Sequence, residues 1–150
     1  MSDERPAPSP HPYGADAPTE DHVGLAFGAL PAAVALGTGI ISLSTILVRT
    51  IQASQPPAQS IELSSGPSIA LLGGTFVALT AAAILTWRLL APTRSPYRQG
   101  MLAMVSAFGT LLVSLLTMPI DRAFGRPGLA ALAVVSLAAC WLLVRRVRAG

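Results

Sequence analysis

The chain alternates long apolar runs with short charged segments. Four stretches contain no Asp, Glu, Lys, Arg or His side chain, and they lie at 23–48, 63–87, 99–120 and 127–144. The shortest has about eighteen residues, and eighteen residues of α-helix extend about 27 Å, close to the roughly 30 Å of a bilayer's hydrocarbon core. Each stretch therefore predicts a membrane-spanning helix.

The alternative to helices in a membrane is a β-barrel, and the pattern does not fit one. Barrel strands need segments of about ten residues in which apolar and polar positions alternate, whereas these runs are apolar throughout. A helix satisfies its own backbone hydrogen bonds in lipid. We therefore expect an all-α membrane protein, with a four-transmembrane-helix bundle over residues 23–146 and spans near 28–48, 67–90, 97–119 and 127–145.

Prolines mark where several of these helices should begin. Pro96 follows a serine, which is the usual order of a capping residue and a first helical residue, and Pro67 and Pro127 can take the same position in the second and fourth spans. Pro31 lies inside the first apolar run. A proline inside a helix breaks or kinks it, so we expect the first helix to start near Leu30.

The two ends of the chain are polar. Residues 1–22 are rich in Pro, Ala and acidic residues, a composition that buries too little apolar surface to fold, so this tail is expected to be disordered. Because it precedes the first apolar run, no cleavable signal peptide is expected. Residues 147–150 form a short basic C-terminus.

The arginines give the direction of insertion. Seven lie in the N-terminal tail, the connection between the second and third stretches, and the C-terminus; three lie in the other two connections. Basic residues are retained on the cytoplasmic side, so we expect both termini in the cytoplasm of a multi-pass protein. Aromatic rings that suit the headgroup level stand at span ends or one turn from a charge: Trp87, Tyr97 and Trp141.

Composition agrees with this interpretation and narrows the function. Hydrophobic residues make up 52% of the 150 residues and charged residues only 11%, less than half the roughly 25% of a soluble domain. The net charge of +3 is the difference between ten basic and seven acidic residues, and because the chain has no lysine the basic residues are all arginines. They flank apolar runs without forming a dense patch, so nucleic acid is not an expected partner. The use of arginine in place of lysine, together with abundant alanine, is typical of a GC-rich bacterial genome. We therefore expect the protein in a bacterial plasma membrane.

Small and hydroxyl residues recur every three or four positions in the spans. Such faces let membrane helices approach closely and hydrogen bond. The residues that we expect to mediate helix packing are Gly28, Ala32, Gly39, Gly74, Ala78, Ala82, Ser106, Thr110 and Ser114. The opposite face of the third span is bulky and contains methionines and Phe108.

Several chemistries lack the residues they need. No Asp, Glu, Lys or His lies deep in a span, which argues against proton-coupled and ion-coupled transport. His11 and His22 both precede the first span, so two histidines cannot ligate a haem inside the membrane. Neither a serine–base pair nor a metal-binding cluster is present. We therefore expect no cofactor, no metal and no enzymatic activity.

One charged turn remains as a candidate contact site. Asp121, Arg122 and Arg126 fall between the third and fourth spans, on the expected outer side. They suit either an anion or partner contact, or a solvated turn with a weak ion pair.

These patterns favour a small non-catalytic membrane protein: an accessory, scaffold or assembly subunit of a membrane complex. Its expected partners are the lipid bilayer and either another membrane protein or further copies of itself. The alternative hypothesis is a small self-associating channel or transporter, in which Ser106, Thr110 and Ser114 would line a pathway.

Overall fold

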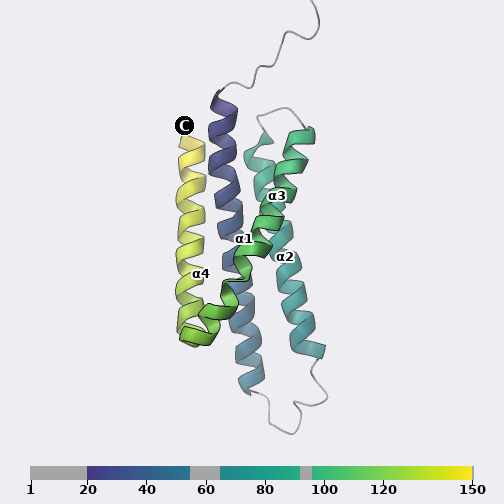
Figure 1. Cartoon of the computed structure of the whole chain (residues 1–150), viewed down its shortest axis with the longest axis vertical. Coiled ribbons are helices and arrows are strands. Elements are labelled where there is room, and N and C mark those ends of the chain that lie inside the picture. Colours follow the sequence, from purple (N-terminus) through teal and green to yellow (C-terminus); the bar gives the residue numbers. More distant parts are fainter. Residues whose placement is uncertain (1–19, 55–64, 92–95, 150) are drawn as a thin grey trace, which may run out of the picture.

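The structure is a computed structural model that describes residues 20–91 and 96–149 apart from 55–64. Within these residues the chain forms four helices and no strand (Figure 1). Their bounds are α1, Glu20–Ser54; α2, Ser65–Leu89; α3, Pro96–Ser114; and α4, Thr117–Ala149. The expected start of a helix at Pro96 is confirmed. Of the tail 1–22, expected to be disordered, residues 1–19 lie outside the described residues, whereas residues 20–22 belong to α1.

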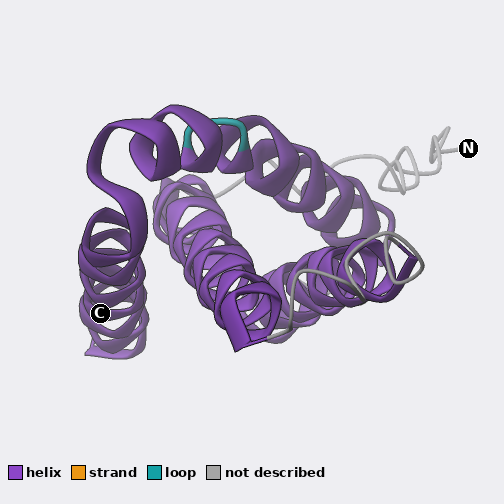
Figure 2. Ribbon diagram, turned by 90° about the horizontal axis from the view of Figure 1, so that it is seen from below, coloured by secondary structure: helices purple, strands orange, loops and turns teal. Residues whose placement is uncertain are grey.

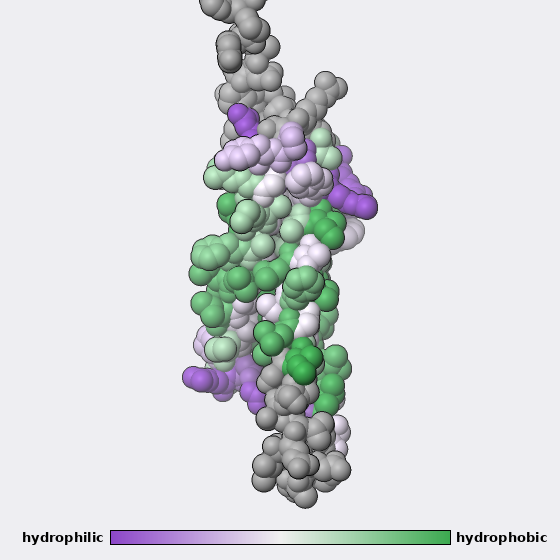
Figure 3. Space-filling model, turned by 90° about the vertical axis from the view of Figure 1, so that its right-hand side faces the viewer, coloured by the Kyte–Doolittle hydropathy of each residue, from purple (hydrophilic) through white to green (hydrophobic). Residues whose placement is uncertain are grey.

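Three of the four helices are long and apolar enough to cross a membrane. They are α1 from Gly24, α2 from Ile69, and α4. The helix α3 is not among them, because its first turn contains Tyr97, Arg98 and Gln99 and it ends at Ser114. On one face of the molecule, apolar side chains form a band between hydrophilic residues at the two ends (Figure 3).

The helix α1 occupies the centre of the bundle. It packs against α2, α3 and α4, whereas α3 and α4 barely touch each other. Viewed end-on, α4 stands to one side of the other helices (Figure 2). The start of α1, the end of α2 and the start of α3 lie near the C-terminus, at what we call the C-terminal end of the bundle; the end of α1 lies at the opposite end (Figure 1).

The expected start of the first helix near Leu30 is wrong. The helix α1 begins at Glu20 and runs through Pro31 without interruption to Ser54. Proline has no N–H to donate to the carbonyl of Phe27, four residues earlier. The side chain of Pro31 is exposed, whereas Ala29, Ala32 and Ala33 around it are fully buried. The packed residues on either side hold the helix together across this position.

The expected continuous helix over 97–119 is also interrupted. After Ser114 the amides of Leu115 and Leu116 donate to carbonyls only three residues back, at 3.2 and 3.0 Å, and α4 then begins at Thr117. Pro119 explains the break, because its ring clashes with the carbonyl of Leu115 and it has no N–H to donate there. The chain thus bends between α3 and α4 (Figure 1).

A second change of direction occurs inside α4, at Gly125. Its φ of 61° and ψ of −148° are not helical, and side chains with a Cβ rarely adopt this conformation. Gly128 completes the turn, since a Cβ there would overlap Phe124 Cβ. The longer part of α4 then returns toward the C-terminal end of the bundle (Figure 1).

The interior is built from small side chains, which brings the helix backbones close together. Ala29, Ala32 and Ala33 of α1 and Ala78 and Ala82 of α2 are fully buried. Close packing replaces the hydrophobic effect as the force between helices in lipid, so each added atom at these contacts matters.

Gly73 and Gly74 of α2 allow a matched test of this packing. A Cβ at Gly74 would overlap Ser44 of α1, while a Cβ at Gly73 would meet no atom within 4 Å. We expect Gly74→Ala to lower the free energy of unfolding by roughly 1–3 kcal/mol through overpacking. Gly73→Ala should leave it unchanged or raise it by up to about 1 kcal/mol through helix propensity. Unfolding in mixed micelles measures both, and equal effects would contradict this packing.

Candidate functional site

The hydroxyl groups expected to pack the third span lie at two kinds of place. Ser106 and Thr110 are fully buried between helices. The hydroxyl oxygens of Ser106 and Thr86 lie 2.9 Å apart and join α3 to α2, and each is also within hydrogen-bond distance of a carbonyl of its own helix. Thr110 donates to the Ser106 carbonyl at 2.9 Å, and its side chain packs where a Cβ at Gly37 of α1 would be.

Ser114 belongs instead to the break between α3 and α4. Its hydroxyl donates to the Leu111 carbonyl, and the hydroxyl of Thr117 donates to the Ser114 carbonyl, both at 2.6 Å. The break leaves carbonyls without their usual helical partners, and Ser and Thr side chains can satisfy such groups within a membrane. These two hydroxyls therefore make the interruption tolerable.

The hydroxyl groups of Ser106, Thr110 and Ser114 thus take part in helix packing or satisfy carbonyls at the break. Among the described residues, every buried side-chain nitrogen or oxygen has a hydrogen-bond partner. Ser106 and Thr110 expose no surface to a solvent-filled path in this chain. A pathway along them would require the helices to separate and those hydrogen bonds to be replaced.

The other expected packing residues also fall at helix contacts. Gly28 faces Val147 of α4, Gly39 faces Leu137 of α4 at 2.9 Å from an ideal Cβ, and Gly74 faces Ser44 of α1. The alanines are fully buried: Ala32, Ala78 and Ala82. Sequence reasoning missed Gly37 and Gly109, which meet Thr110 and Val34 across the α1–α3 contact, although the glycines themselves are a visible signal.

Gln99 is a further buried polar residue that sequence reasoning missed. It begins the inner face of α3, and its amide nitrogen donates to the Leu90 carbonyl at 3.0 Å. Leu90 follows the end of α2 and is itself almost fully buried. This hydrogen bond fixes the start of α3 against the end of α2. A glutamine in the first turn of an otherwise apolar helix was the available signal.

A charged cluster occupies the end of the bundle opposite the C-terminus. Asp121 forms an ion pair with Arg49 of α1, and Arg126 donates to the Arg49 carbonyl at 3.3 Å. Only 12% of the Asp121 side chain is exposed, against 52% for Arg49. Arg122 is exposed beside them. The expected turn residues are therefore connected to the end of α1, and Arg49 is the partner that sequence reasoning did not assign.

An open depression of about 380 Å³ adjoins this cluster. Its lining includes Arg49, Gln52, Asp121 and Arg126. The carboxylate of Asp121 already compensates one guanidinium, so the cluster has limited capacity for an anion. Its main effect is to connect the end of α1 to the turn that precedes the longer part of α4.

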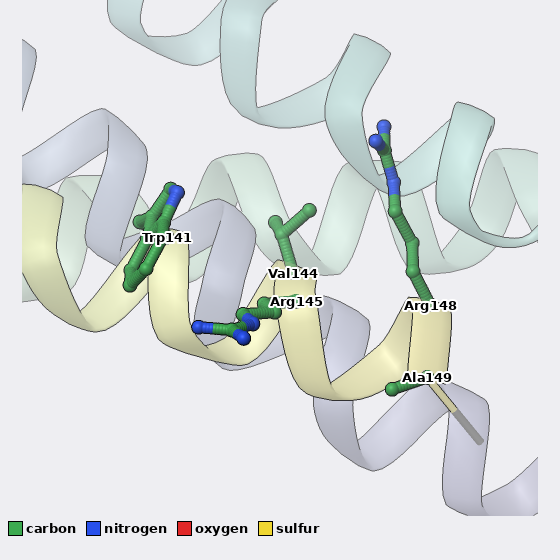
Figure 4. Close-up of a pocket in the computed structure, with 5 residues that line it drawn as sticks. All are labelled: Trp141, Val144, Arg145, Arg148 and Ala149. Carbon is green, nitrogen blue, oxygen red and sulfur yellow. The ribbon is translucent and has the colours of Figure 1, made fainter.

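A second open depression lies at the C-terminal end of the bundle. It has a volume of about 360 Å³ and is lined by residues of α4 alone (Figure 4): Trp141, Val144, Arg145, Arg148 and Ala149. The guanidinium carbon of Arg145 lies 5.5 Å from the centroid of the Trp141 ring, within the range of a cation–π contact.

Within the described residues, no group of three or more His, Cys, Asp or Glu side chains could hold a metal ion. No family, no curated protein and no solved structure matches this chain.

The Arg49–Asp121 pair yields a test of the charged cluster. We expect Asp121→Asn to lower the free energy of unfolding by about 1 kcal/mol, the upper part of the range for exposed pairs, because Asp121 is mostly buried. The exchanged pair Arg49→Asp with Asp121→Arg should recover part of this loss. Arg122→Gln serves as the control and should change little. A loss of equal size in the control would contradict the assigned pairing. Thermal unfolding in detergent measures all three variants.

Proposed function

We propose that the chain crosses the membrane four times. The third crossing would comprise α3 and the first part of α4, up to the reversal at Gly125, and the fourth the remainder of α4. The Ser114 and Thr117 hydroxyls support a bent third crossing, since they satisfy carbonyls at the bend. The apolar band between two hydrophilic ends is consistent with a bilayer around the bundle (Figure 3).

We further propose that the C-terminal end of the bundle faces the cytoplasm of a bacterial cell, with the protein in its plasma membrane. Five described arginines belong to this end: Arg88, Arg98, Arg145, Arg146 and Arg148. Three belong to the opposite end: Arg49, Arg122 and Arg126. The excess of positive charge supports this direction.

Cysteine labelling in intact cells tests the direction of insertion. In a Cys140→Ala background, Gln52→Cys should react with a membrane-impermeant maleimide, and Arg98→Cys should react only after the membrane is opened. The two positions belong to opposite ends of the bundle and both side chains are exposed. The reverse pattern of labelling would overturn the proposed direction.

For the function itself, we propose a non-catalytic accessory, scaffold or assembly subunit of a membrane complex. The main support for this proposal is the exposure of the outer face of α3. Bulky side chains remain exposed there beside an interrupted backbone, including Met104 at 76% and Phe108 at 63%. The interior hydroxyls, by contrast, are already engaged in hydrogen bonds.

Two properties of this face favour a protein partner. A backbone interruption within the apolar zone is better accommodated where another protein covers it than in direct contact with lipid. Methionine side chains are flexible and polarisable, so they adapt to a neighbouring surface. Met101 and Met104 of this face are exposed, as is Met118 at the start of α4. A transmembrane helix of another subunit would fit such a face.

Purification from native membranes in mild detergent, followed by mass measurement of the intact assembly, tests the proposal. We expect a stoichiometric partner subunit. The double variant Met104→Ala with Phe108→Ala should lose most of this partner while the chain still folds, because both side chains are exposed. The matched control, Phe76→Ala, removes an aromatic ring that is 71% exposed on α2 and should keep the partner.

Other results would count against the accessory-subunit proposal. A homo-oligomer without a foreign subunit would favour the channel or transporter, and flux through reconstituted vesicles would then be measured with the Ser106→Ala and Thr110→Ala variants. A monomer, or a partner retained equally by the α3 and α2 variants, would contradict docking on α3.

A further inference from the structure

The depression at the C-terminal end of α4 has a basic and aromatic lining on one face of one helix. Trp141, Arg145 and Arg148 are spaced four and three residues apart, so their side chains emerge on the same side of α4. In Figure 4 the Arg145 side chain runs back along α4 toward Trp141, the Arg148 side chain points away from both, and Val144 lies between Trp141 and Arg148. None of the five lining residues is acidic.

The floor of the depression is fixed by the core of the bundle. Val144 packs against a cluster formed by Ala29 and Ala32 of α1 and by Leu89 and Leu90 at the end of α2. The Arg145 guanidinium is held near the Trp141 ring. Two of the lining side chains are therefore positioned before any ligand arrives, which lowers the entropy lost on binding.

The surroundings match the boundary between headgroups and acyl chains. Trp141 is 59% exposed, and on the side away from the C-terminus α4 presents further exposed apolar side chains, among them Val134 and Val135. Indole rings favour the headgroup level, and the aliphatic surface beyond is suited to acyl chains. Guanidinium groups bind phosphate oxygens through paired N–H donors.

We propose that this depression binds the phosphate of an anionic phospholipid. Arg145 and Arg148 donate hydrogen bonds to the phosphate oxygens, Trp141 flanks the glycerol region, and the acyl chains lie along the exposed apolar side of α4. The inference goes beyond the proposed role as a subunit, but it rests on the proposed insertion of α4 in a bilayer.

The two tryptophans of the chain allow a direct measurement. In a Trp87→Phe background, Trp141 is the only source of tryptophan fluorescence. The full-length protein is reconstituted in vesicles of phosphatidylcholine and phosphatidylglycerol, with bromine on the acyl chains of one lipid at a time. Quenching of Trp141 by each brominated lipid gives the relative association of the two lipids with this site.

We expect phosphatidylglycerol to be preferred over phosphatidylcholine by about 25-fold, since each of the two arginines near the anionic headgroup contributes on the order of fivefold. Arg148→Gln, which leaves the Arg145–Trp141 contact in place, should reduce the preference by about fivefold. Arg146→Gln is the matched control, because it removes the same charge from the same helix end without lining the depression. The control should retain most of the preference.

Each contrary result has a distinct meaning. Equal quenching by the two lipids, or an equal loss in the Arg146 and Arg148 variants, would overturn the lipid site while leaving the membrane insertion intact. The absence of quenching by either lipid would overturn both. Loss of the preference on adding millimolar inorganic phosphate would identify free phosphate as the occupant in place of the lipid. A partner retained on α3 in the Arg148 variant would show that the subunit role stands independently.

Discussion

Close approach of neighbouring helices to α1 is the constraint on which the bundle depends. Gly37, Gly39 and Gly28 leave room on α1 for Thr110, Leu137 and Val147, and α2 supplies Gly74 opposite Ser44 of α1. In lipid, no hydrophobic effect drives helices together, so attraction comes from atoms in direct contact and from hydrogen bonds between helices. Because these glycines have no Cβ atom, side chains of the neighbouring helices can approach the backbone closely. The glycines of α1 therefore determine where the neighbouring helices pack.

The sequence was most informative where a feature depends on one helix alone. Long uncharged runs predicted an all-helical fold, and the proline after Ser95 predicted the start of α3. The sequence was less informative where two prolines of similar appearance behave differently. Pro31 is accommodated inside α1, while Pro119 accompanies the break after Ser114. A helix can end and a new one begin where hydroxyl groups and neighbouring helices stabilise the interrupted backbone. The sequence of one span does not show whether neighbouring helices do so.

Partners across the bundle were the least predictable feature of the candidate sites. The small residues on α1 and α2 could be recognised from their spacing, but their counterparts are ordinary side chains such as Leu137 and Val147. Likewise, Asp121 stood out as an acid in a short turn, whereas its partner Arg49 lies at the end of a helix far away in the sequence. The spacing of residues along the sequence shows which face of a helix has small or charged side chains. The helix that packs against this face depends on how the chain reverses direction at Gly125.

The attachment of α4 to α1 has a consequence for biosynthesis. The contacts of Gly28 and Gly39 are with Val147 and Leu137, which lie about a hundred residues later in the chain, and α3 contributes little to holding α4 in place. While the ribosome is still translating, α1 is already complete but one of its glycine faces has no intramolecular counterpart. During that interval this face of α1 is uncovered, and the arrival of α4 covers it.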